Sequence, residues 1–81
     1  MITVVVSSKS DFKPLYNQKV AISYDSFLNG CVSPYVNTDR DGAAKIDVEH
    51  RRNAKGKVHV NGRVAYEGYI ESFMSVSIAY P

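Results

Sequence analysis

Apolar and polar residues alternate with a period of two through most of this chain. The alternation is clearest in residues 2–7, 18–25, 43–50 and 73–80. Successive side chains of a β-strand point to opposite faces, so each of these segments is predicted to be a half-buried strand. A shorter strand is expected at 35–38. The residues predicted to face the core are Ile2, Val4, Val6, Val20, Ile22, Tyr24, Ala44, Ile46, Val48, Met74, Val76, Ile78 and Tyr80.

The strongest local signal is Asn61-Gly62, which lies between two alternating segments, 57–60 and 63–71. A two-residue type I′ turn needs positive φ at both central residues, which Asn and Gly tolerate best. We therefore expect a β-hairpin here. Its core face is predicted to carry Val58 and Val60 from the first arm, and Val64, Tyr66 and Ile70 from the second.

A polar turn at 39–42 precedes the strand at 43–50, and we interpret residues 36–48 as a β-hairpin near the middle of the fold. Gly42 can adopt positive φ without steric cost, and aspartate side chains bond nearby backbone amides. An alternative is calcium, because Asn37, Asp39, Asp41 and Gly42 match positions 1, 3, 5 and 6 of an EF-hand loop. Position 12 would be Val48, where a bidentate Glu is required, so the turn is favoured.

No window of eleven residues shows apolar spacing typical of a helix without an interruption by Gly, Pro or strict alternation. The sequence therefore predicts an all-β fold without a substantial helix. Six to seven short antiparallel strands separated by turns indicate a β-sandwich of immunoglobulin-like or transthyretin-like type. Residues 1–81 are expected to form one domain.

Composition narrows the class of protein only slightly. The 81 residues are 44% hydrophobic and 22% charged, which is typical of a globular domain, and the net charge is +2. Cys31 is the only cysteine, which excludes an internal disulfide and a cysteine-based zinc site. No segment has the length of a membrane span. The N-terminus lacks the features of a signal peptide, which predicts a cytoplasmic location if the chain is complete.

Several segments resemble carboxypeptidase-regulatory-like and transthyretin-like domains. Residues 13–15 before the strand at 20–22, the turn and strand at 38–46, and the segments 56–60 and 66–69 carry this resemblance. It covers about residues 13–78 and implies a seven-stranded sandwich that serves as an accessory, adhesive or interaction module. One transthyretin-like branch hydrolyses a purine-degradation intermediate and ends in Tyr-Arg-Gly-Ser. Residues 77–81 lack that motif.

Candidate catalytic and metal-ligating residues are sparse. His50 and His59 have no cysteine, carboxylate or second histidine at metal-ligand spacing. No Gly-x-Ser-x-Gly elbow and no glycine-rich phosphate loop occurs. We therefore predict no catalytic residue, no metal and no cofactor.

Two groups of residues are candidates for binding. The first is aromatic, because tyrosine and phenylalanine outside a core are typical of interfaces. The second is the basic segment 50–57, which is suited to phosphate or acidic partners. The candidate binding residues are Tyr16, Phe27, Tyr35, Arg51, Arg52, Lys55, Lys57 and Tyr69. The first and last strands are also expected to be sheet edges open to pairing.

These observations favour a non-enzymatic interaction or structural module that binds a protein partner through loops or an edge strand. Self-association as a homodimer is one form of this hypothesis. The alternative is a small transthyretin-like enzyme or ligand carrier. A third hypothesis is a polyanion-binding module that uses the basic segment, although the small net charge disfavours nucleic acid.

Overall fold

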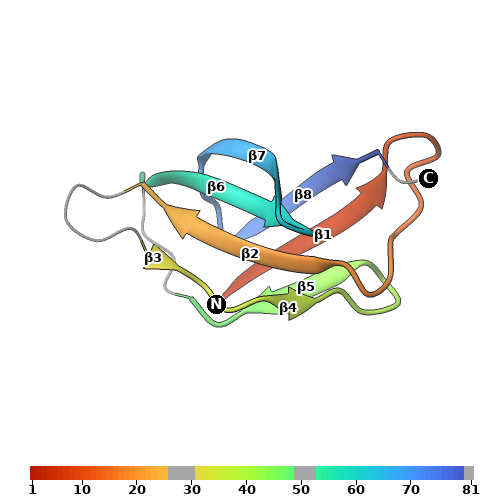
Figure 1. The fold of residues 1–81 in the computed structure, drawn as a ribbon, viewed down its shortest axis with the longest axis horizontal. Coiled ribbons are helices and arrows are strands. Elements are labelled where there is room, and N and C mark those ends of the chain that lie inside the picture. Colours follow the sequence, from red (N-terminus) through yellow and green to blue (C-terminus); the bar gives the residue numbers. More distant parts are fainter. Residues whose placement is uncertain (26–30, 49–52, 80–81) are drawn as a thin grey trace.

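The computed structural model describes residues 1–25, 31–48 and 53–79. These residues form an all-β sandwich, and none of them is helical, as the sequence predicts (Figure 1). The strands are β1 (Ile2–Ser8), β2 (Lys19–Tyr24), β3 (Cys31–Val32), β4 (Val36–Asn37), β5 (Ala43–Ile46), β6 (Lys55–Val60), β7 (Arg63–Tyr69) and β8 (Phe73–Ile78).

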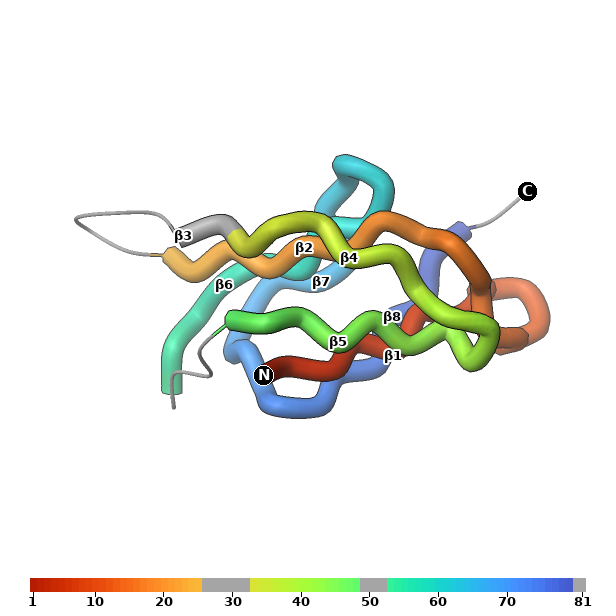
Figure 2. Tube along the Cα trace, turned by 90° about the horizontal axis from the view of Figure 1, so that it is seen from below, coloured from red at the N-terminus to blue at the C-terminus, as the bar shows by residue number. Residues whose placement is uncertain are grey.

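The strands form two sheets, which lie as two layers in Figure 2. One sheet has the order β5-β1-β8, and the other has the order β3-β2-β6-β7. β4 also pairs with β2, at Lys19 and Val20, whereas β3 pairs with β2 at Ser23 and Tyr24. β3 and β4 therefore follow each other along one edge of β2. The eight segments occupy seven strand positions, in agreement with the predicted size of the sandwich.

The core lies between the two sheets and consists mainly of residues that the alternation predicts. Val48 and Ile78 are only partly buried, and Tyr80 lies outside the described residues. Every second residue of β1, β2 and β6 is buried, as are Met74 and Val76 of β8. The largest fully buried side chains are Ile2, Ile22, Ile46, Ile70, Val4, Val6, Val20 and Val58. Burial of these aliphatic groups is the main force that holds the sheets together.

One pair of strands differs from the predicted antiparallel arrangement. β1 pairs with β8 in parallel, from Thr3 opposite Phe73 to Ser8 opposite Ile78. β1 is consequently the central strand of its sheet, so the expectation that the first strand is an edge was wrong. The chain reaches this arrangement at residues 70–72, where it leaves β7 in one sheet and enters β8 in the other.

The turn at 39–42 also differs from the prediction, because it does not close a hairpin within one sheet. β4 pairs with β2 and β5 pairs with β1, so the turn carries the chain between the layers. The Asp39 carboxylate accepts hydrogen bonds from the backbone N–H groups of Asp41 and Ala43, at 2.9 and 3.0 Å. The N–H of Val6 donates to the carbonyl oxygen of Gly42 at 2.8 Å, which fixes the turn against β1.

The predicted hairpin between β6 and β7 is confirmed. Asn61 and Gly62 have φ of 54° and 83°, and Val60 pairs with Arg63 directly across the turn. Positive φ at both central residues is the signature of a type I′ turn. The Asn61 side chain also accepts from the N–H of Lys19 at 3.1 Å, which ties the hairpin to β2.

The predicted core face of β7 is wrong at Val64. Tyr66 lies opposite Val58, and Val64 lies opposite His59, so Ala65 is an extra residue between the two pairs. An extra residue makes a β-bulge and reverses the face of every side chain before it. Val64 therefore shares the outer face with His59 and is 51% exposed, whereas Tyr66 is half-buried against the core.

Candidate interaction edge

Within residues 1–25, 31–48 and 53–79, the two sheets have four strand edges, and three of these edges carry features that hinder pairing with another chain. Natural edges are protected by short strands, proline, charged side chains and bulges. The β3/β4 edge consists of two-residue strands separated by residues 33–35, which include Pro34. β5 is four residues long and exposes Lys45. β7 contains the bulge at Ala65 and the charged residue Glu67.

β8 is the exception. Its six residues include no charge and no proline, and its register with β1 continues without a shift from Phe73 to Ile78. Phe73 and Ser75 are exposed, whereas Met74 and Val76 face the core. Among the described residues, no strand pairs with the outer side of β8. The expectation that the last strand is an edge is therefore confirmed.

A groove opens beside the C-terminal half of β8. β7 and β8 are consecutive strands in different sheets, joined through residues 70–72. The groove lies between the start of β7 and the end of β8 and has a volume of about 620 Å³. Its lining includes Lys9, Arg63, Val64, Ala65, Ser77 and Ile78. The groove thus combines apolar side chains with two cations and the ends of two sheet edges.

The charges around β8 are divided between its two ends. Lys9 lies at the C-terminal end, where its N–H donates to the carbonyl oxygen of Ile78 at 2.9 Å, and Arg63 lines the same groove. Glu71 is exposed and lies two residues before the N-terminal end of β8. None of the three forms an ion pair within the described part of the chain. β8 is therefore an uncharged strand with an anion before it and cations at its end.

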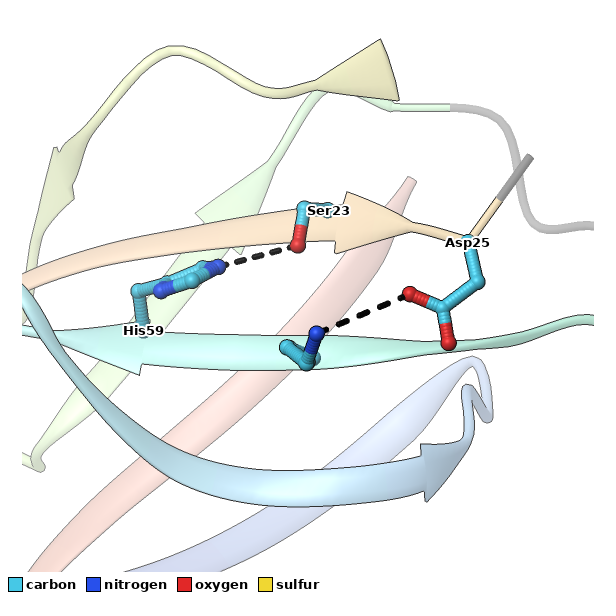
Figure 3. A network of polar contacts seen from close by, with 4 residues as sticks. Ser23, Asp25 and His59 are labelled. Carbon is cyan, nitrogen blue, oxygen red and sulfur yellow. Dashed lines mark hydrogen bonds and ion pairs between the residues drawn. The ribbon is translucent and has the colours of Figure 1, made fainter. Parts of the chain in front are cut away.

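The outer face of the larger sheet carries a polar cluster that the sequence does not reveal. Ser23 Oγ and His59 Nε2 are 2.9 Å apart, and Lys57 Nζ lies 4.0 Å from the Asp25 carboxylate (Figure 3). Ser23 and His59 are separated by 36 residues, and only the register of β2 with β6 brings them together. Alternation assigns both residues to the outer face but gives no register between the strands.

This cluster does not have the arrangement of a catalytic triad. A triad places a carboxylate on the second nitrogen of the histidine and backbone donors at an oxyanion site. Here the Asp25 carboxylate contacts Lys57 instead. β2 and β6 also lie inside the sheet, where their amides serve the ladder between strands. The Ser23–His59 contact is better explained as cross-strand pairing.

The predicted aromatic binding residues are exposed but do not form one patch. Tyr16, Tyr35 and Tyr69 are 63%, 56% and 52% exposed. Tyr35 lies near the start of β2, in a shallow depression with Asn17. Tyr69 pairs with Lys55 at the opposite end of the larger sheet. Phe27 lies outside the described residues.

The predicted basic residues are only partly described. Lys55 Nζ lies 5.4 Å from the centre of the Tyr69 ring, which is a cation–π contact. Lys57 lies opposite Glu67 and near Asp25. Acidic and aromatic neighbours therefore accompany both lysines, so these two residues do not form a continuous positive face. Arg51 and Arg52 lie outside the described residues.

The turn at 39–42 is explained by its own hydrogen bonds. The Asp39 oxygen that would be a calcium ligand accepts from two backbone amides. Within residues 1–25, 31–48 and 53–79, no group of three His, Cys, Asp or Glu side chains is arranged to hold a metal ion. The same residues include no helix long and apolar enough to cross a membrane.

Comparisons with known proteins identify no relative of this chain. No protein-family model, no curated protein and no solved structure matches it. The resemblance to carboxypeptidase-regulatory-like and transthyretin-like domains therefore remains a prediction.

Proposed function

We propose that the protein is a non-enzymatic interaction module that binds an extended protein segment by strand addition to the outer edge of β8. The observation that supports this proposal is the absence of charge, proline and bulge from β8, in a domain whose other three edges have such protection. A free edge offers a row of backbone donors and acceptors to an incoming strand.

The groove favours a polypeptide over a small ligand. Its volume lies within the range of small-molecule sites. However, it opens between two edge strands, so an extended chain would gain main-chain hydrogen bonds along β8 that a small molecule cannot make. The polar cluster on the outer face of the larger sheet lacks the arrangement of a catalytic triad, and Lys55 and Lys57 have aromatic and acidic neighbours.

A peptide titration followed by nuclear magnetic resonance tests this function. The probe is the capped, uncharged hexapeptide Thr-Val-Thr-Val-Thr-Val, with the protein dilute enough to exclude self-association. Strand addition depends on the main chain, so we expect amide shifts concentrated in residues 73–79 and weak, millimolar binding.

Two variants serve as matched controls for the titration. Ser75→Lys adds a charge to the exposed side of β8 and is expected to weaken the binding of the peptide at least threefold. Ser75→Thr keeps the strand uncharged and is expected to bind as the wild type does. Shifts centred on β5 or β3, or equal binding by the lysine variant, would contradict the proposed function.

A further inference from the structure

We infer that the segment that pairs with β8 is β8 of a second copy of this chain, in antiparallel orientation, with Ser75 on the two-fold axis. This inference rests on the proposed function and adds the identity of the partner. The result is a continuous six-stranded sheet with the order β5-β1-β8-β8-β1-β5.

The division of charge around β8 favours this partner. Glu71 precedes the strand, whereas Lys9 and Arg63 lie at its other end. Antiparallel pairing places the Glu71 end of each copy beside the cationic end of the other. Parallel pairing would place like charges together, which is unfavourable. β8 is therefore complementary to itself in one orientation only.

The faces of the strand determine the register. Residues opposite each other in an antiparallel pair point to the same side of the sheet. Since Met74 and Val76 face the core, the residue opposite Met74 must also face the core. That residue is Val76 of the second copy, or a residue two positions before or after Val76. The registers centred on Ser75 and on Val76 each pair five residues of β8, and we infer the one centred on Ser75 because it brings Glu71 to the groove. This register places Phe73 opposite Ser77 and Glu71 opposite Ala79. Ser77 and Ala79 both line the groove of the second copy.

This register also provides a contact for the exposed aromatic residue of β8. Phe73 is 65% exposed, and it would lie at the mouth of the groove of the second copy. Its ring would lie beside Ser77 of the second copy on the outer face of the sheet, while Glu71 approaches Lys9 and Arg63. Burial of such an aromatic side chain supplies much of the energy of a small interface.

The dimer is expected to be weak. A pair of six-residue strands with one aromatic contact at each end is smaller than the roughly 1,200–2,000 Å² of stable interfaces. A covalent trap is therefore a sharper test than the molecular mass alone.

Cysteine cross-linking tests the register. In a Cys31→Ser background, Ser75→Cys places two cysteines opposite each other, at about 4.5–5.5 Å between Cα atoms, which suits a disulfide. Ser72→Cys is also exposed, but its two copies would be about 20 Å apart, or six residues along the strand. Mild oxidation should cross-link the Ser75 variant at least tenfold faster than the Ser72 variant. Equal rates would overturn the inference.

Charge exchange tests the orientation without depending on the stability of any one variant. In the Ser75→Cys background, Glu71→Lys makes both ends of β8 positive, and Lys9→Glu with Arg63→Glu makes both ends negative. At low salt each variant alone should cross-link about three- to tenfold more slowly. An equal mixture should recover the original rate as a heterodimer, which a folding defect would not allow. Single variants that cross-link as fast as the Ser75→Cys parent would overturn the antiparallel arrangement, and so would a mixture no faster than its components.

The two proposals can fail separately. If the chain stays monomeric in these tests but the Thr-Val hexapeptide still shifts β8, the second copy is excluded and the edge remains a binding site. If neither the peptide nor a second copy engages β8, both proposals fail.

Discussion

Two glycines with positive φ show how single residues determine the turns of this sandwich. Gly42 has φ of 77° and Gly62 has φ of 83°, but their surroundings differ. A Cβ at Gly42 would lie 2.6 Å from the carbonyl oxygen of Val6 and 2.9 Å from Cβ of Pro14. A Cβ at Gly62 would meet no atom within 4 Å. Gly42 is thus required for both conformation and close packing, and Gly62 for conformation alone.

Alanine substitutions at these two glycines should separate the two effects. Gly62→Ala is expected to lower the free energy of unfolding by about 1 kcal/mol, which is the cost of positive φ in a residue with a Cβ. Gly42→Ala should cost about 3 kcal/mol or more, because the turn must also move away from β1. Urea denaturation of both variants measures the difference, and equal losses would contradict the packing of the turn against β1.

Neighbouring residues determine local conformation in this chain, but they do not determine the contacts between residues that are distant in the sequence. The turn at 39–42 and the Asn61-Gly62 hairpin are encoded by neighbouring residues, so their conformations follow from the sequence. The contact between Ser23 and His59 depends on the register of two strands that are far apart in the chain. Nothing near either residue specifies that register.

At the scale of elements, the bulge in β7 explains why an apparently regular strand does not bury one face. Ala65 is the extra residue, and it places Val64 on the outer face opposite His59. β7 lies at the edge of its sheet, where a bulge disturbs few hydrogen bonds. Alternation cannot reveal a single inserted residue, because Val64 and Tyr66 remain two positions apart in the sequence.

Truncation of two valines in this hairpin tests the bulge. Val58 is fully buried in β6, so Val58→Ala should lower the free energy of unfolding by about 2 kcal/mol or more. Val64 is half-exposed, and Val64→Ala should cost about 0.5 kcal/mol. Thermal or denaturant unfolding measures both losses. A similar large loss at both positions would place Val64 in the core and contradict the bulge.

At the scale of the whole molecule, the connection at 70–72 decides which edges are open. This connection carries the chain into the other sheet. There β8 pairs in parallel with β1, which is the first strand in the sequence. The alternation predicts the strands and the inward face of β8 but not this long-range parallel pairing. The all-β sandwich was therefore predictable from the sequence, whereas the central position of β1 and the groove beside β8 were not.

The central claim is that β8 has an open outer edge to which another chain can pair. Residue-resolved amide hydrogen exchange of the wild-type protein over a dilution series tests this claim most directly. In the most dilute sample, the β8 amides that point toward β1 should be protected, and the alternate amides that point outward should exchange almost freely. Outward amides should gain protection as the protein is concentrated. Slow exchange of every β8 amide at the lowest concentration would show that the edge is covered within a single copy, and would contradict the claim.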